Sequence, residues 1–312
     1  MPADTLPLQA VVEGLREVRH AWRQSQGRAP EAGARELPSR EVLATVVDQL
    51  RGALFPMRLG PPDLRPDHED FYVGHTLAAA LTALRQQAEL ELRHHARQGG
   101  ADATEAAPGP RAAEAVQRFA ERLPSVRRLL DSDVLAAFKG DPAARSVDEV
   151  LLCYPGLRAG INHRLAHQLY QLELPLVARV VAELAHAETG IDIHPGAQIG
   201  PGFFVDHGTG VVIGETAVIG AQVRFYQNVT LGAKSFPAGA DGTLRKGLAR
   251  HPIVEDGVVI YAGATVLGRV TIGRGSVIGG NVWLTHSVPP FSHVTQADAT
   301  QADRPSAPRP AA

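Results

Sequence analysis

Cysteine, aromatic residues and long apolar runs are all scarce in this chain of 312 residues. The single cysteine, Cys153, excludes an internal disulfide and suits a reducing cytosol. No uninterrupted apolar stretch is long enough to span a bilayer, and the N-terminal stretch lacks the basic and apolar regions of a signal peptide. A formal net charge of −2 gives no reason to expect nucleic acid or an anionic membrane as a partner. We therefore expect a cytoplasmic protein.

Glycine is plentiful, with 31 copies against 5% aromatic residues, and this balance favours tight, repeated turns. Hydrophobic residues make up 44% of the chain, which allows a substantial core. Within residues 1–189, apolar side chains recur at three- and four-residue spacing, as in Leu15, Val18 and Trp22. That spacing predicts an all-helical domain. Residues 98–111 are small and polar and contain proline, so we predict a flexible connection there.

After Gly190 the spacing of the apolar residues changes to six. Ile193, Ile199 and Val205 begin a series that slips by two residues and resumes at Ile213. A period of six fits neither a helix nor an alternating strand, and it is typical of a parallel β-helix built from hexapeptides. The repeated aliphatic side chains would stack inside the coils, and the glycines that follow many of them would allow the corners.

The predicted β-helix spans residues 190–291 and follows the helices, which makes the protein α+β. Two prolines should stop the last coil, and the Pro-rich tail at 292–312 is expected to be disordered. The repeat breaks twice, first at the slip around Asp206 and His207. The second break, residues 233–252, is too long and polar for a wall and should protrude as a loop. Function concentrates at such breaks.

Charged residues at these breaks could carry chemistry. Asp192 and His207 are fifteen residues apart, and a coil of three hexapeptides has roughly 18 residues, so the two should lie on adjacent coils. A carboxylate on one imidazole nitrogen would leave the other free to take a proton from a hydroxyl, which would make His207 a general base. The alternative is a surface histidine beside a surface aspartate. Arg250, beside His251, has a guanidinium fork that suits a carboxylate ligand, or it is a solvated residue at a loop exit.

Two further patterns have mainly structural interpretations. Asp141 precedes a proline, which by itself indicates a turn. His163 and His167 are one helical turn apart, a spacing that suits a metal ion. Since no third ligand is evident, we favour helix packing for this pair.

Several stretches together resemble the serine O-acetyltransferase family. They include "TGIDIHPGAQIGPGFFVDHGTGVVIGETAVIG" and "RHPIVEDGVVIYAGATVLG", and the similarity covers about residues 140–291. The resemblance implies transfer of an acetyl group from acetyl-CoA to the hydroxyl of L-serine. It also implies left-handed coils and subunits that form trimers or dimers of trimers. Many members bind O-acetylserine sulfhydrylase through a tail ending in Ile; this chain ends Arg-Pro-Ala-Ala, which leaves that partner open.

The resemblance also implies roles for individual residues. His207 would be the catalytic base and Asp192 its partner. The serine site would contain Asp141, Asp206, Arg250 and His251, with Glu215 orienting the arginine. Acetyl-CoA would run past Ala233 and Ala262. No metal is implied, because the thioester is already activated.

Three other functions remain open at this stage. One is a hexapeptide-repeat acetyltransferase acting on a sugar or antibiotic. Another is a γ-type carbonic anhydrase, which needs three imidazoles on a metal, from candidates His194, His207, His251 and His286. The last is a trimeric scaffold that displays its helices to a partner enzyme.

Overall fold

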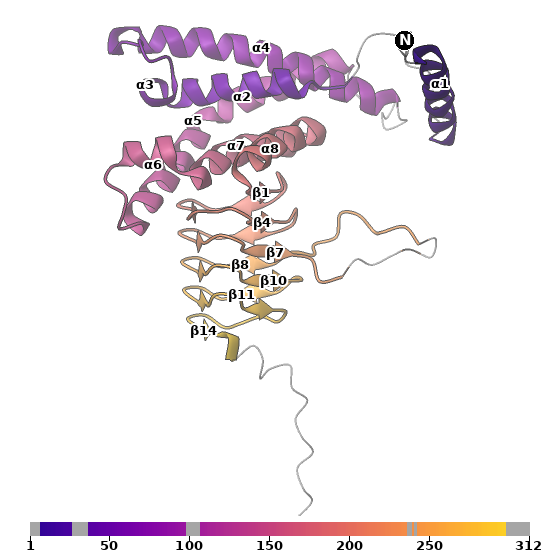
Figure 1. Ribbon diagram of the computed structural model, residues 1–312. Coiled ribbons are helices and arrows are strands. Elements are labelled where there is room, and N and C mark those ends of the chain that lie inside the picture. The colour runs from indigo at the N-terminus through magenta and orange to yellow at the C-terminus, as the bar shows by residue number, and fades with distance from the viewer. Residues whose placement is uncertain (1–6, 27–36, 98–106, 236–238, 240–241, 298–312) are drawn as a thin grey trace, which may run out of the picture. The chain divides into compact units, whose positions relative to one another are not determined.

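The computed structural model (Figure 1) describes residues 7–26, 37–97, 107–235, 239 and 242–297. The chain divides into two units, Met1–Leu37 and Pro38–Ala312. The first unit holds helix α1 (Leu8–Ser25), in which no residue is buried. Among the described residues, no helix combines the length and apolarity that crossing a bilayer requires.

The second unit begins with helices that share one apolar core, which includes Leu43, Leu84, Phe119 and Leu165. Full burial of each such side chain stabilises the fold by about 1.5–3 kcal/mol. The helices are α2 (Arg40–Leu54), α3 (Pro56–Leu59), the 3-10 turn η1 (Pro66–His68), α4 (Glu69–His95), α5 (Pro108–Gly140), α6 (Val147–Cys153), α7 (Pro155–Gln171) and α8 (Pro175–Thr189).

The predicted flexible connection at 98–111 is wrong over its last part. Helix α5 begins at Pro108, because proline at a first helical position sacrifices no hydrogen bond and its fixed φ suits a helix. The segment 98–106 lies outside the described residues.

Short strands form the rest of the second unit, stacked below α7 and α8 in Figure 1. They belong to three parallel sheets, which we name A, B and C. Sheet A contains β1 (Asp192–Ile193), β4 (Val212–Ile213), β7 (Thr230–Gly232), β10 (Thr265–Leu267) and β13 (Trp283–Leu284). Sheet B contains β2 (Gln198–Ile199), β5 (Val218–Ile219), β8 (Ile253–Val254) and β11 (Thr271–Ile272). Sheet C contains β3 (Phe204–Val205), β6 (Arg224–Phe225), β9 (Val259–Ile260), β12 (Val277–Ile278) and β14 (His293–Val294).

The chain visits sheets A, B and C in turn, which confirms the predicted parallel β-helix. Residues at the six-residue period point inward: Ile213, Phe225 and Leu231 are each at most 1% exposed. The glycines that follow many of them are explained by close approach. A Cβ on Gly200 would lie 2.6 Å from the carbonyl carbon of Gly220 in the next coil. Between β7 and β8 the chain leaves the stack (Figure 1).

The predicted end of the β-helix is wrong by one strand. The predicted tail began at residue 292, but β14 pairs in parallel with β12. The two prolines lie in the turn before β14, and Val294 fills an inward position at 9% exposure. The coil therefore tolerates prolines where its backbone turns. Residues 298–312 lie outside the described part of the chain.

A buried ion pair joins the helices to the first coil. Asp133 of α5 and Arg164 of α7 form two hydrogen bonds of 3.0 and 3.1 Å, and both side chains are about 5% exposed. Arg164 also donates to the carbonyl oxygens of Ile199 and Gly200, the latter at 2.6 Å. Asp133 accepts the backbone N–H of Phe203 at 2.9 Å. These contacts satisfy buried backbone groups at the start of the β-helix.

Candidate active site

The predicted site residues lie along two different edges of the β-helix. We call the corners between sheets C and A the C–A edge, and those between sheets A and B the A–B edge. His207 lies between β3 and β4 and therefore on the C–A edge. Arg250 and His251 lie between β7 and β8 and therefore on the A–B edge. Sheet A separates the two groups within one chain.

The slip in the repeat widens one corner of the C–A edge. The corner between β3 and β4 contains residues 206–211, whereas that between β6 and β7 contains only 226–229. Backbone hydrogen bonds between the coils align Thr209 with a residue of the shorter corner. His207 and Gly208 are therefore the two inserted residues. Both adopt left-handed backbone, with φ of 57° and 88°. The insertion pushes the imidazole outward, and the His207 side chain is 70% exposed.

Two carboxylates flank this imidazole. Asp206 is only 7% exposed, and its Oδ1 lies 3.8 Å from Nδ1 of His207. Asp141, at the end of α5, accepts a hydrogen bond from the Tyr154 hydroxyl and another from the backbone N–H of Ala143. These bonds lower the pKa of Asp141, and the nearby charges of Arg224 and His207 add to the effect. The C–A edge thus places the exposed imidazole of His207, a potential base, beside the negative charges of Asp206 and Asp141.

Asp192 occupies the first position of β1, close to two titratable residues of α8. The structure records no hydrogen bond or ion pair between the described residues Asp192 and His207. The ligand atoms of Asp192, Glu183 and His186 lie within 4.8 Å of one another and could hold a cation. Nη2 of Arg179 lies 2.5 Å from Oε1 of Glu183, so the charge of Glu183 is already balanced without a cation. The predicted pairing of Asp192 with His207 stays a prediction.

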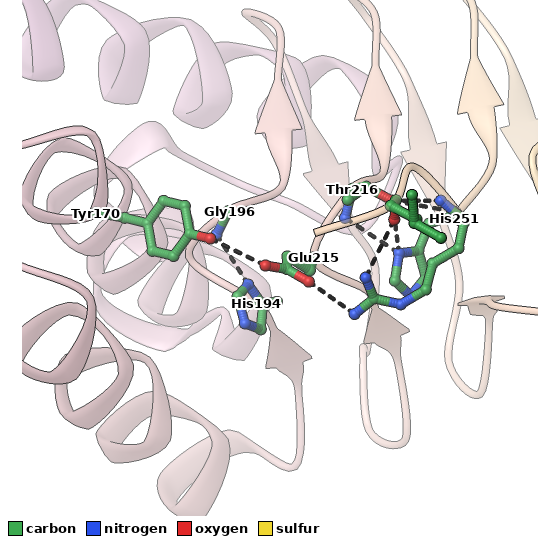
Figure 2. A network of polar contacts seen from close by, with 8 residues as sticks. Tyr170, His194, Gly196, Glu215, Thr216 and His251 are labelled. Atoms are coloured by element: carbon green, nitrogen blue, oxygen red, sulfur yellow. Dashed lines mark hydrogen bonds and ion pairs between the residues drawn. The ribbon is translucent and has the colours of Figure 1, made fainter. Parts of the chain in front are cut away.

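On the A–B edge an ion pair orients Arg250 (Figure 2). Its Nη2 lies 2.7 Å from Oε2 of Glu215, whose other oxygen accepts the Tyr170 hydroxyl at 3.0 Å. Burial alone would raise the pKa of Glu215, but the hydrogen bonds from Arg250 and Tyr170 outweigh it and the pKa is lowered. Burial, followed by the hydrogen bond to Glu215, raises the pKa of Tyr170. Glu215 is therefore an anion that fixes the guanidinium.

His251 is held as a neutral imidazole. The backbone N–H of Thr216 donates to its Nδ1 at 3.1 Å, so the proton of the neutral ring is on Nε2. The Thr216 hydroxyl lies 2.9 Å from the same nitrogen (Figure 2). Burial, followed by the charge of Arg250, lowers the pKa of His251 to about 4. The ring packs closely against Gly214, where a Cβ would lie 2.1 Å from two ring atoms.

A basic cleft of about 560 Å³ lies beside this group. One carboxylate, Glu215, faces it, and the cations lining it are Lys234, Arg245, Lys246, Arg250 and Arg269. This excess of positive charge suits an anionic ligand. Ala233, predicted to contact acetyl-CoA, directly precedes Lys234 on this edge. Ala262, the other predicted contact, lies on the C–A edge, in the corner between β9 and β10.

The imidazoles considered for a metal lie on two edges of the β-helix, with His194, His251 and His286 on the A–B edge and His207 on the C–A edge. His194 lies on the A–B edge, where its Nδ1 accepts the N–H of Gly196 at 3.0 Å. His207 lies on the opposite edge of sheet A. In α7, His163 is 2% exposed, and burial holds its pKa well below the usual value. His167 bonds the carbonyl oxygen of Pro195 at 2.8 Å.

Sequence reasoning missed several residues that hold these groups in place. They are Tyr154, Tyr170, Thr216 and Arg224. One signal was present: Arg224 directly precedes two aromatic residues one coil after the slip, at an outward position of the repeat. The cations of residues 244–250 were also visible as a charge cluster. The partners of the two tyrosines lie 13 and 45 residues away, and no local pattern marks them.

Known proteins of the same architecture match this chain. The model of the bacterial transferase hexapeptide (six repeats) matches residues 251–286. A plasmid serine acetyltransferase of Synechococcus elongatus is 59% identical over 262 residues, which is 84% of this chain and 82% of the relative. The chain belongs to the serine acetyltransferase family. The Bacillus subtilis serine acetyltransferase is 47% identical over 54% of this chain and 73% of its own length.

Solved serine acetyltransferases share the fold. Entamoeba histolytica serine acetyltransferase 1, in complex with L-cysteine, has a TM-score of 0.69 and 36% identity, and the match covers 80% of this chain and 86% of that one. Soybean serine acetyltransferase complexed with serine has a TM-score of 0.51 and 29% identity, over 84% and 96%. Family membership makes the chain an acyltransferase. It favours this activity over the sugar or antibiotic acetyltransferase, the carbonic anhydrase and the scaffold.

Proposed function

We propose that this chain transfers the acetyl group of acetyl-CoA to the hydroxyl of L-serine, giving O-acetyl-L-serine and CoA. This is the first step of cysteine biosynthesis from serine. The observation that carries the proposal is the imidazole of His207, pushed outward beside Asp206 and Asp141 in a chain 59% identical to a serine acetyltransferase. Carboxylates near the base suit an acceptor with an ammonium group, which a sugar lacks.

His207 acts as the general base in this mechanism. It takes the proton from the serine hydroxyl while that oxygen attacks the thioester carbonyl carbon. The tetrahedral intermediate then collapses, the carbon–sulfur bond breaks, and the imidazolium returns its proton to the CoA thiolate. General-base help of this kind is typically worth about 10²–10⁴-fold. The thioester is already activated, so the step needs no metal.

Asp192 is the proposed partner of His207. The His207 side chain is largely exposed and can rotate, and Asp192 pairs in register with Val212, the first residue of the strand that follows the corner of His207. A carboxylate on one ring nitrogen would fix the tautomer and stabilise the imidazolium that forms. Asp206, at 3.8 Å from the same ring, adds to that stabilisation.

Arg250 would bind the serine carboxylate, with Glu215 orienting its guanidinium and His251 beside it. Asp141 and Asp206 would bind the ammonium group. Because Arg250 and His207 lie on opposite edges of sheet A, we infer that the site forms between the C–A edge of one subunit and the A–B edge of its neighbour. A closed ring of three such contacts makes a homotrimer. Pairing of trimers through the helices would give a hexamer.

The basic cleft on the A–B edge is the proposed site for the phosphates of acetyl-CoA. Its cations match the negative charge of three phosphate groups, and Lys234 adjoins Ala233. In the trimer, Ala262 of the neighbouring subunit's C–A edge would line the same groove. We place the enzyme in the cytoplasm, since Cys153 is a free and exposed thiol, as reducing compartments allow. A pull-down with O-acetylserine sulfhydrylase would test for a complex between the two enzymes.

The activity is tested by release of CoA thiol from acetyl-CoA in the presence of L-serine, other amino acids and sugars. We expect turnover with L-serine and little with acceptors that lack an amino-acid head group. Equal or faster turnover with a sugar would contradict the proposal.

The two-subunit site is tested by mixing His207→Asn and Arg250→Ala and allowing their subunits to exchange, at an L-serine concentration far below the KM of Arg250→Ala, where each variant alone turns over slowly. A site is intact when it takes His207 from one variant and Arg250 from the other. Each condition holds with a chance of one half, so we expect about a quarter of wild-type activity. A mixture as inactive as its parts would show that both residues act from the same subunit.

A further inference from the structure

Arg224 links the helices to the C–A edge beside His207. It lies on β6, one coil after Phe204, and points away from the interior of the β-helix, since Phe225 fills the inward position. Its Nη2 donates to Oδ2 of Asp206 at 2.7 Å, and its Nη1 donates to the carbonyl oxygen of Gly140 at 2.6 Å. Gly140 is the last residue of α5 and directly precedes Asp141.

Aromatic rings fix the plane of this guanidinium. Its central carbon lies 4.9 Å from the ring centre of Phe204 and 4.6 Å from that of Tyr226. The side chain is only 24% exposed, and its Nε is buried without a hydrogen-bond partner. A planar guanidinium can stack on two rings while it donates two directed hydrogen bonds, whereas a compact ammonium group has no plane to stack.

The carboxylate of Asp141 is fixed from its other side. The Tyr154 hydroxyl donates to Oδ2, and the backbone N–H of Ala143 donates to Oδ1 at 2.8 Å. Arg224 therefore holds the backbone just before Asp141, while Tyr154 holds its side chain. Asp206, in turn, is held by Arg224 alone among the described side-chain hydrogen bonds. The two carboxylates thus keep one spacing although they come from different parts of the fold.

We propose that Arg224 is a positioning residue that holds Asp141 and Asp206 at a fixed spacing beside His207 and thereby sets the affinity for the amino-acid acceptor. The proposal rests on the proposed serine acetyltransferase activity. Arg224 compensates the buried charge of Asp206, so the acceptor's ammonium group is bound mainly by Asp141. Arg224 does not touch the basic cleft, which lies on the other edge of sheet A. Its loss should affect one substrate and spare the other.

The test compares Arg224→Met and Arg224→Lys with the wild-type enzyme by steady-state kinetics in both substrates. For Arg224→Met we expect the KM for L-serine to rise about tenfold or more, as for a lost hydrogen bond to a charged group, with the KM for acetyl-CoA within about twofold. Arg224→Lys keeps the charge but reaches only one of the two hydrogen-bond acceptors, Asp206 or the Gly140 carbonyl. Its KM for serine should therefore lie between the values of the wild-type enzyme and Arg224→Met. Arg274→Met is the matched control, since that guanidinium also lies over a ring, 5.5 Å from the centre of Phe291, but far from His207 in the coil order.

Three results would overturn the proposal. The first is a folded Arg224→Met enzyme whose KM for serine is unchanged. The second is a parallel rise of both KM values together with a lower melting temperature, which would show a merely structural role. In both cases the wild-type enzyme still acetylates serine, and only the role of Arg224 fails. The third is a wild-type protein without serine-dependent CoA release, which would overturn the proposed activity and this role together.

Discussion

The C–A edge and the A–B edge of this β-helix differ in charge and in how they depart from the repeat. The C–A edge gains an exposed imidazole from an insertion of two residues and gathers the carboxylates of Asp141 and Asp206 around it. The A–B edge gains cations from a long insertion after β7 and keeps the imidazole of His251 buried and neutral. One regular scaffold therefore supplies two unlike half-sites, and the departures from the repeat decide what each can bind.

Loss of the base on the C–A edge should have the largest effect. We expect His207→Asn to lower kcat by about 10²–10⁴-fold, because asparagine tolerates the left-handed backbone of position 207 but cannot take a proton. The measurement is CoA release at saturating L-serine, with an unchanged melting temperature as the control. Turnover near that of the wild-type enzyme would remove His207 from the role of base.

Loss of the guanidinium on the A–B edge should act on binding more than on turnover. We expect Arg250→Ala to raise the KM for L-serine by about 10- to 100-fold, the cost of a lost hydrogen bond to a charged group. Glu215 would also lose its partner at 2.7 Å. Steady-state kinetics with varied serine is the measurement, and an unaltered KM would exclude Arg250 from carboxylate binding.

A methyl group at Gly214 should disturb the A–B edge alone. Its Cβ would lie 2.1 Å from the His251 ring, so Gly214→Ala must displace that ring and should destabilise the fold by about 1–3 kcal/mol. Gly160→Ala is the matched control, because nothing lies within 4 Å of a Cβ at that helical position. Urea unfolding of both variants is the measurement. Equal stability of the two would mean that the ring moves aside freely.

The pH dependence of stability should report the buried imidazole of the A–B edge. The folded-state pKa of His251 is about 4, against 6.5 for an ordinary histidine, so the unfolded chain binds the proton first. Stability should therefore fall as the pH drops from 6.5 towards 4. His251→Gln should show a shallower fall over that range in unfolding experiments. Identical slopes for the two proteins would contradict a neutral, buried His251.

The sequence predicted the fold because its main signal is local. Stacked coils repeat their inward aliphatic residues every six positions, and the slip at Asp206 and His207 marks the widened corner directly. The predictions were wrong at Pro108 and at His293–Val294, where composition indicated flexibility. The structure has the start of a helix at the first position and a strand of the final coil at the second. The bonds of Tyr154 and Arg224 could not be predicted, because they depend on how α5 meets the coils.

The Asp133–Arg164 pair has a consequence for solubility. β1, β2 and β3 are the outermost strands of their sheets, and such strands recruit other chains through their unpaired backbone groups. Arg164 already takes the carbonyl oxygens of Ile199 and Gly200, and Asp133 takes the N–H of Phe203. The helices therefore cover the outermost strands and prevent edge-to-edge aggregation. A fragment that begins at β1 would expose these unpaired backbone groups and should aggregate.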